Sequence, residues 1–445
     1  MYISLTTLPS NMCPYNHTCT YTVTLPSSTL DRNFSSVLRA TEKFTAGAVA
    51  STPRTPVAAV STASVNAIGI KVNTVDNGSS SVTLSVSVVG AGSRSESPHE
   101  HGFAQVLAAT AFSGSATQSG LRAVRTLEDH GAKFSASATR DSVTYHVHCM
   151  ADKLDAVAAV VADVVCNPVT ANKHYYIVEN RTGLSAKASK HFSCGFSQLD
   201  DLLHEAAYGA GAPLGGAAYY AKAMTAPIDQ VMAFRARTFV PGNIVICGSG
   251  VSHAALSESV DKHFRFQAGS KNALPTTPLP PSPYVGGDVK VRSTSDKAWA
   301  GLAFPVPAGA AAGAFCVLHS ALSAAAPAGT RMFHHQYADG GLLGFKVSGG
   351  SAADASKALE AAILSLKAVA SAGVTDAAVK NARLSAREHT ALVQRTITGM
   401  TTSGATAAQA SAAAKSVLAT ARPAYAVYGA TAGSASYEAV KALLK

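Results

Sequence analysis

The chain has 445 residues, of which 47% are hydrophobic and only 14% are charged, so it can bury enough core for two or three domains and is not disordered as a whole. The 36 Lys and Arg residues against 26 Asp and Glu leave a net charge of +10, but no stretch gathers five or more basic residues, which argues against nucleic-acid binding. The 7 cysteines form no Cys-x-x-Cys pair, which argues against a disulfide framework or a thiolate zinc site and indicates a reducing compartment.

Residues 1–50 are poor in acids and rich in Ser, Thr and Ala. Only Asp31 and Glu42 are acidic, against three basic residues, and no apolar stretch resembles a secretory signal. This composition is typical of an organellar targeting segment. The segment is interpreted either as an organellar presequence or as an N-terminal extension retained in the mature protein.

The first half then predicts a strand, a helix, a hairpin and two further helices. Residues 81–89 alternate Val and Leu with Ser and Thr, which predicts a strand with one buried face. A small-residue helix follows at 101–112. Asp152 is the expected N-cap of a helix with an apolar stripe. The hairpin and the two later helices are expected at 132–140 with 142–150, at 153–165 and at 173–190.

The second half repeats this order, and a proline-rich segment separates the halves. Ser351 is the expected cap of the long helix, and Thr375 with Asp376 the cap of the next. The corresponding strand, helix, strand and long helix are expected at 298–306, 309–324, 341–349 and 351–373. The repeat predicts two related α+β domains, 51–267 and 285–445, joined by a linker at 268–284.

Residues 298–330 contain no charged residue and are the strongest candidate for a membrane span. Pro305, Pro307 and Pro327 interrupt this stretch, and His319 lies within it. Ala and Gly outnumber Leu and Ile, so the stretch is interpreted as a buried strand followed by a buried helix, and no spanning segment is predicted.

Histidines are the remaining candidates for chemistry. His146 and His148 alternate on one predicted strand face, but no third metal ligand accompanies them, so a polar hairpin face is the favoured interpretation. His99 and His101 flank Glu100 before the first helix without completing a metal-binding pattern. His334 and His335 are expected in an ordinary surface connection. No phosphate-binding loop and no Gly-x-Ser-x-Gly motif occurs.

An ordered series of segments resembles the M16 family of inverted-zincin metallopeptidases, which includes the mitochondrial processing peptidase and the core subunits of the cytochrome bc1 complex. No single motif is specific, but the series covers roughly residues 55–445. The segments are AGSRSES (91–97), HGFAQVLAATAFSGSATQSG (101–120), LEDHGAKFSASATRDSVTYHVHCMADKLD (127–155), GNIVICGSGVSHAALSESVDKHF (242–264) and QYADGGLLGFKVSGGSA (336–352).

Active members of this family bind zinc through His-x-x-Glu-His on a helix and a further Glu downstream. The resemblance places this motif on QVLAA, with Gln105, Ala108 and Ala109 where His, Glu and His would stand. The downstream Glu falls near 184–188, which contains no acid, and Glu179 is too early. We therefore predict no catalytic, metal-ligating or cofactor-binding residue in this chain.

The resemblance further implies a fold of two domains, each a mixed sheet with helices mainly on one face and the other face lining a cavity. It implies a non-catalytic, core-2-like subunit of mitochondrial ubiquinol–cytochrome c reductase, peripheral on the matrix side of the inner membrane. Its expected partners are a core-1 or β-processing-peptidase-like subunit and the cytochrome b, cytochrome c1 and Rieske subunits, which carry the haem and iron–sulfur groups. The alternative is the non-catalytic α-type subunit of the processing peptidase, which binds presequences.

Overall fold

The computed structural model describes residues 60–167, 185–218, 227–266, 281–385, 393, 396–398 and 405–445. All of them belong to the unit Ala58–Lys445. Residues 1–50, residues 173–184 of one predicted helix and residues 268–280 of the predicted linker lie outside the described part.

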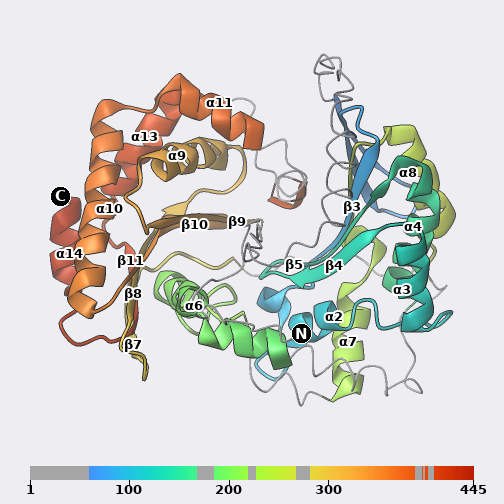
Figure 1. The fold of residues 1–445 in the computed structure, drawn as a ribbon, viewed down its shortest axis with the longest axis horizontal. Helices are drawn as coiled ribbons and strands as arrows, with labels where there is room; N and C mark the ends of the chain where they lie inside the picture. Colours follow the sequence, from blue (N-terminus) through green and yellow to red (C-terminus); the bar gives the residue numbers. More distant parts are fainter. Residues whose placement is uncertain are drawn as a thin grey trace, which may run out of the picture. The chain divides into compact units, whose positions relative to one another are not determined.

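The first sheet has six strands in the order β1-β2-β6-β3-β5-β4 (Figure 1). Its strands are β1 (Val60–Val65), β2 (Lys71–Asp76), β3 (Ser81–Val89), β4 (Lys133–Ala138), β5 (Ser142–Met150) and β6 (Ile244–Ser249). The described helices that accompany them are α2 (Phe103–Ala109), α3 (Gly120–Asp129), α4 (Leu154–Cys166), α7 (Ile228–Thr238) and α8 (His253–His263).

The second sheet has five strands in the order β7-β11-β8-β10-β9. Its strands are β7 (Gly287–Arg292), β8 (Ala298–Val306), β9 (Arg331–Tyr337), β10 (Gly340–Gly349) and β11 (Ala424–Gly429). The later helices are α9 (Ala312–Ala325), α10 (Ala352–Ala372), α11 (Asp376–Ser385), α13 (Ala407–Leu418) and α14 (Tyr437–Leu444), and α6 (Gly195–Tyr208) precedes the sheet in the chain.

The two sheets share one topology, which confirms the predicted repeat of two α+β domains. Strands β2 and β6 pair in parallel, as β7 and β11 do. The central strands β3 and β8 each pair antiparallel with two neighbours, β6 and β5 in one sheet, β11 and β10 in the other. The outer strands β4 and β9 also match. Within the described ranges, β1 is the one strand without a counterpart in the second sheet.

The apolar residues that alternate along residues 81–89 face the core of the first domain, as predicted. Val82, Leu84, Val86 and Val88 are buried together with the apolar stripe of α4. The helix cap predicted at Asp152 is wrong, because residues 151–153 form a 3-10 turn and Lys153, not Asp152, precedes α4. The caps at Ser351 and Thr375 are confirmed, since their hydroxyl oxygens accept from the N–H groups of Asp354 and Ala378.

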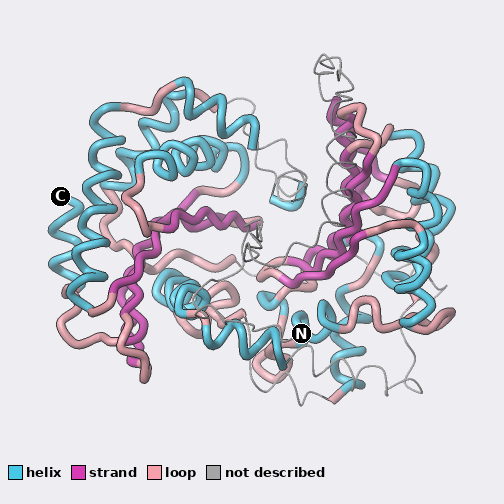
Figure 2. The backbone as a smooth tube through the Cα atoms, in the orientation of Figure 1, coloured by secondary structure: helices cyan, strands magenta, loops and turns pink. Residues whose placement is uncertain are grey.

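The second sheet carries helices on both faces (Figure 2). Leu302 and Phe304 of β8 pack on the side of α9, α10 and α13. The opposite face of β8 receives α6, which comes from the first half of the chain and buries Leu199 and Leu203 there. A Cβ on Gly301 would lie 2.9 Å from Leu203, so glycine allows this close approach. The expectation that this face is left open to line a cavity is therefore wrong, because α6 packs on it.

The uncharged stretch 298–330 forms β8 and α9, as predicted. Among the described residues, no single helix has the length and apolar composition to cross a membrane, although α10 and residues 376–383 pass that test together as a pair bent by 112°.

The surface connection predicted around His334 and His335 is wrong. Both histidines lie on β9, which pairs antiparallel with β10. His334 is directed to the helix side, and burial lowers its pKa to about 3, so that its ring is neutral. The apolar residues Met332 and Phe333 are adjacent and do not alternate with polar ones, so the sequence RMFHHQY does not show the pattern of a strand.

Candidate functional site

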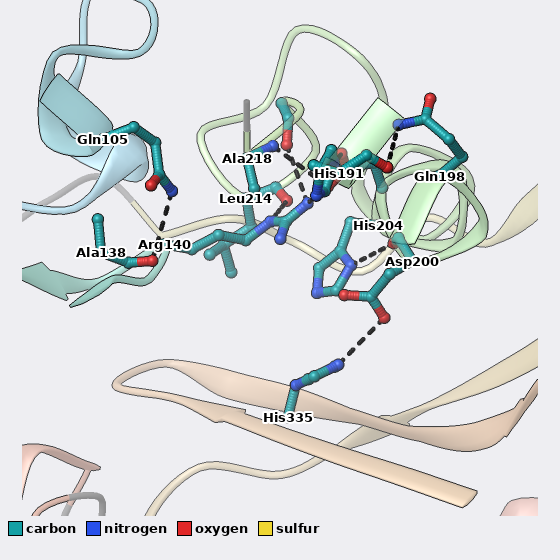
Figure 3. Close-up of polar contacts among 12 residues, drawn as sticks. Gln105, Ala138, Arg140, His191, Gln198, Asp200, His204, Leu214, Ala218 and His335 are labelled. Carbon is teal, nitrogen blue, oxygen red and sulfur yellow. Dashed lines mark hydrogen bonds and ion pairs between the residues drawn. The ribbon is translucent and has the colours of Figure 1, made fainter. Parts of the chain in front are cut away.

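Helix α2 carries the positions at which the resemblance predicts metal ligands. Gln105 and Ala109 are four residues apart and share one helix face. Gln105 is buried, and its Nε2 donates to the carbonyl oxygen of Ala138, 3.4 Å away at the end of β4 (Figure 3). An amide and two methyl groups, the latter from Ala108 and Ala109, supply neither imidazole nor carboxylate. These residues do not fit the zinc ion of the family's active members.

The wider surroundings offer no replacement ligand set. Across the described ranges, no three His, Cys, Asp or Glu side chains converge in a way that could hold a metal ion. Residues 185–193 are helical and contain no acid, whereas Glu179 lies outside the described residues.

The histidines of β5 take part in cross-strand hydrogen bonds, as the polar-face interpretation predicts. His146 Nδ1 lies 2.6 Å from Ser85 Oγ, and His148 Nδ1 lies 3.0 Å from Thr83 Oγ1. Each histidine stands opposite its partner in the β3–β5 register. Cys149 points to the other face and is buried in the core. These side chains hold neighbouring strands together.

Glu96 holds the entrance of α2. Its carboxylate accepts from the N–H groups of Gly102 at 2.7 Å and Ala104 at 2.8 Å, which satisfies donors that a helix N-terminus leaves unpaired. Burial nevertheless raises the pKa of Glu96 to about 7, against the lowering effect of these two hydrogen bonds.

The raised pKa of Glu96 predicts a pH-dependent contribution to stability. Because the folded carboxyl keeps its proton up to about pH 7 and the unfolded one loses it near 4.5, this contribution is fully present below pH 4.5 and is lost as the pH rises through 7. The free energy of unfolding of the native chain, minus that of Glu96→Gln, should therefore fall between pH 4.5 and 7. Urea titrations of both proteins at several pH values measure this difference, and a flat or rising difference contradicts the assignment.

Seven charged side chains gather where the β4–β5 turn, α6 and the β9–β10 hairpin meet. We call this group the charge cluster: Arg94, Arg140, Asp141, Asp200, Asp201, Asp339 and Lys346.

Arg140 forms the centre of the charge cluster. Its guanidinium donates to Asp201 Oδ1 at 2.8 Å and to the carbonyl oxygens of Leu214 and Gly216 at 3.3 and 3.1 Å (Figure 3). His191 Nε2 lies 2.8 Å from the other oxygen of Asp201. Burial raises the pKa of Asp201, but the hydrogen bond of His191 and the charge of Arg140 outweigh it, and the net pKa is lowered. The buried Arg140–Asp201 pair therefore ties the β4–β5 turn to α6.

Asp200 and His204 extend this contact to the second sheet. Asp200 is bonded to Lys346 of β10 and lies 3.1 Å from His335 Nε2 on β9. Burial raises the pKa of Asp200, but the charge of Lys346 and the contact with His335 outweigh it and hold the pKa well below its ordinary value.

His204 lies beside the charge cluster and is neutral. Its Nδ1 donates to the Asp200 carbonyl oxygen at 2.7 Å, because a carbonyl can only accept. Its Nε2 therefore accepts the hydroxyl of Tyr337 at 2.7 Å. Burial, followed by the charge of Arg140, lowers the pKa of His204 to about 3.

Arg94 makes a second, bidentate link to the β9–β10 hairpin. Its Nη1 and Nη2 donate to the two oxygens of Asp339 at 2.9 and 2.6 Å, and Asp141 lies 3.5 Å away. Fork-shaped pairing of this kind fixes orientation as well as distance. The N–H of Arg94 also donates to the Arg140 carbonyl, and a Cβ on Gly92 would lie 2.2 Å from that same oxygen. Only glycine lets the two arginine-bearing segments come this close.

The chemistry of the charge cluster is structural. Each of its carboxylates has a cationic partner within the described residues, and the cluster holds neither a nucleophile poised beside a base nor a ligand set for a metal. Its contacts join residues 94–141, α6 and residues 335–346, so its function is to fix these three parts of the chain to each other.

Sequence reasoning singled out none of the residues of the charge cluster. One signal was available: two charged residues stand next to each other in a chain that has few charged residues. These are Arg140-Asp141 in a hairpin turn and Asp200-Asp201 in α6. Neither pair identifies its partner, because the partners are 61 residues away for Arg140 and 146 residues away for Asp200.

Comparison with known proteins gives one family for this site. Residues 71–216, which include α2 and the β4–β5 hairpin, match the insulinase family, also called peptidase family M16.

Mitochondrial proteins are among the relatives. The chain is 29% identical to subunit 2 of the cytochrome b-c1 complex of Cryptococcus neoformans, over 50% of each chain. It is 25% identical to a probable α-1 subunit of the mitochondrial processing peptidase of Arabidopsis thaliana, over 54% of this chain and 46% of the relative. It is 26% identical to the β subunit of that peptidase in Caenorhabditis elegans, over 44% and 43%. The matches thus span about half the length of these relatives. Over residues 71–216 the chain is therefore similar to the M16 family of peptidases.

Proposed function

We propose that the chain is a non-catalytic, core-2-like subunit of mitochondrial ubiquinol–cytochrome c reductase, needed for assembly and stability of that complex. The observation that carries this proposal is the chemistry of α2, which has Gln105, Ala108 and Ala109 where the resemblance places the two zinc-binding histidines and the catalytic Glu. The resemblance to subunit 2 of a cytochrome b-c1 complex supports it. A peptidase fold without its metal ligands keeps its capacity to pack against other subunits.

In this role the chain lies on the matrix side of the inner membrane and is attached there peripherally. Its partners are a core-1 or β-processing-peptidase-like subunit and the cytochrome b, cytochrome c1 and Rieske subunits. The haem and iron–sulfur groups belong to those partners, and this chain holds no cofactor of its own. Residues 1–50 then act as a mitochondrial presequence or as an extension, residues 51–267 and 285–445 are the two domains, and 268–284 join them.

The second candidate is the non-catalytic α-type subunit of the mitochondrial processing peptidase, which the relative in Arabidopsis thaliana favours. Presequences are basic, so a surface that receives them attracts them through acidic side chains. The chain has a net charge of +10. In addition, the carboxylates of the charge cluster are already paired with cations. Both features favour the core-subunit role.

Affinity purification of the tagged chain from mitochondria distinguishes the two roles. Co-purifying cytochromes b and c1, identified by mass spectrometry and by a haem spectrum, support the core subunit. A haem-free two-subunit peptidase supports the α-type role and contradicts our proposal.

The purified chain should contain no zinc and cleave no peptide. The side chains at positions 105, 108 and 109 end in an amide and two methyl groups. They cannot hold a zinc ion, so no metal-bound water can form there. Metal analysis by mass spectrometry should give much less than one zinc per chain. A tightly bound zinc in one-to-one ratio, or chelator-sensitive peptidase activity, contradicts the prediction.

A further inference from the structure

The second sheet ends at the edge of β7. In the first sheet, the equivalent edge is covered by an additional strand, β1. In the first sheet, β1 pairs antiparallel with β2 along all six of its residues. Strand β7 is the counterpart of β2, since each pairs in parallel with the strand next to the central one. Among the described residues, no strand pairs with the outer side of β7 (Figure 1). Unpaired N–H and C=O groups of such an edge form a template for another strand.

The side chains of β7 separate by charge between the two faces of the sheet. Asp288, Lys290 and Arg292 alternate along one face and are exposed. Val289 and Val291 lie on the α6 face, where Val291 is 38% exposed. A strand that pairs with β7 should therefore have apolar residues on one face and charges of both signs on the other.

The strand is complementary to itself. When two copies of β7 run antiparallel about a twofold axis at Lys290, Asp288 of each stands opposite Arg292 of the other. Val289 then stands opposite Val291 on the other face. Directly opposite residues of antiparallel strands have Cβ atoms about 4.5–5.5 Å apart, close enough for an ion pair or an apolar contact.

One like-charge pair remains, between the two copies of Lys290. Its cost is reduced because Nζ of Lys290 is held by its own chain. It donates to the Ala435 carbonyl oxygen at 2.9 Å and lies 3.1 Å from Ser434 Oγ. The competing register, centred on Val289, would require Lys290 to leave these acceptors to pair with Asp288. The register centred on Lys290 keeps them.

We propose that β7 is a docking edge for a second copy of this chain, which joins two second sheets into one continuous sheet with Asp288 paired to Arg292 across the twofold axis. The partner is a second copy because both faces of the strand, charged and apolar, match their own image. This inference is independent of the proposed function, since it concerns the outer edge of the second sheet and not α2 or the charge cluster.

Charge reversal tests the pairing. Asp288→Arg and Arg292→Asp each place two like-charge pairs across the axis, so each should weaken dimerisation of the full-length chain on the order of tenfold. An equimolar mixture of the two variants restores opposite charges at both positions and should dimerise like the native chain. Sedimentation velocity over a range of concentrations measures this, and circular dichroism of each variant confirms that these exposed substitutions leave the fold intact.

Cysteine crosslinking tests the register. In the proposed register Lys290→Cys places two cysteines directly opposite each other, so mild oxidation should give a disulfide-linked dimer that the native chain does not give. Asp288→Cys is the matched control, because its opposite residue is Arg292 and no symmetric disulfide can form.

Three results overturn the proposal. The first is a native chain that is monomeric throughout, as expected when a strand of a different protein occupies the edge. The second is a dimer that is insensitive to both charge reversals or is not restored by mixing them. The third is crosslinking through Val289→Cys without crosslinking through Lys290→Cys.

Discussion

Replacing Arg140 with methionine should lower the free energy of unfolding by about 3–5 kcal/mol, the usual cost of removing one partner of a buried ion pair. The side chain of Arg140 is 6% exposed and that of Asp201 is 12% exposed. Methionine fills a similar volume but leaves the Asp201 carboxylate and the carbonyl oxygens of Leu214 and Gly216 without their donor. Urea unfolding followed by circular dichroism measures the loss.

The chain supplies a matched control for this substitution. Lys153 pairs with Asp152 at 3.3 Å, but the two side chains are 47% and 67% exposed. Lys153→Met should therefore change stability by less than about 1 kcal/mol. The double variant Arg140→Met/Asp201→Leu should regain part of the loss, because it removes the uncompensated charge. Equal effects of Arg140→Met and Lys153→Met would contradict the role assigned to the charge cluster.

The second large effect is expected on α6. Leu203 is fully buried against β8, where Gly301 leaves room for it, so Leu203→Ala should cost about 2–5 kcal/mol through lost burial and a residual cavity. The result matters for the architecture, because α6 precedes the linker in sequence and yet packs on the sheet that follows it.

Leu364→Ala on α10 is the corresponding control, because this leucine is also helical but 63% exposed. It should change stability by less than about 0.5 kcal/mol. The same urea titrations serve for both variants. A small effect at Leu203 would mean that α6 is not held by the second sheet.

Sequence reasoning succeeded where one strand or helix carries its own signal. Residues 81–89 and 298–306 were predicted as strands with the bounds that the structure has, because each is a long run with a continuous apolar or alternating pattern. The cap at Ser351 followed from local chemistry. The repeat was recognised because both halves place these elements in the same order.

It failed where the outcome depends on a distant partner. Strand β9 was missed because its burial comes from α6 and α9, not from an alternation of its own. Only part of the site could be predicted from the sequence. The resemblance placed Gln105, Ala108 and Ala109 on one helix, whereas nothing in the sequence predicted the charge cluster. A carboxylate such as Asp200 acquires its role from a lysine on another strand, and no local pattern encodes that distance.

The position of α6 also has a consequence for synthesis of the chain. This helix leaves the ribosome before β6 completes the first sheet and long before any strand of the second sheet exists. Leu199 and Leu203 therefore have no native surface to cover them until β8 and β11 have been made, and β11 lies close to the C-terminus. Domains usually fold in the order of their synthesis. Here the apolar face of α6 stays uncovered until the last strand of the chain has been made, so a nascent chain that stalls within the second half exposes a site for chaperones or for aggregation.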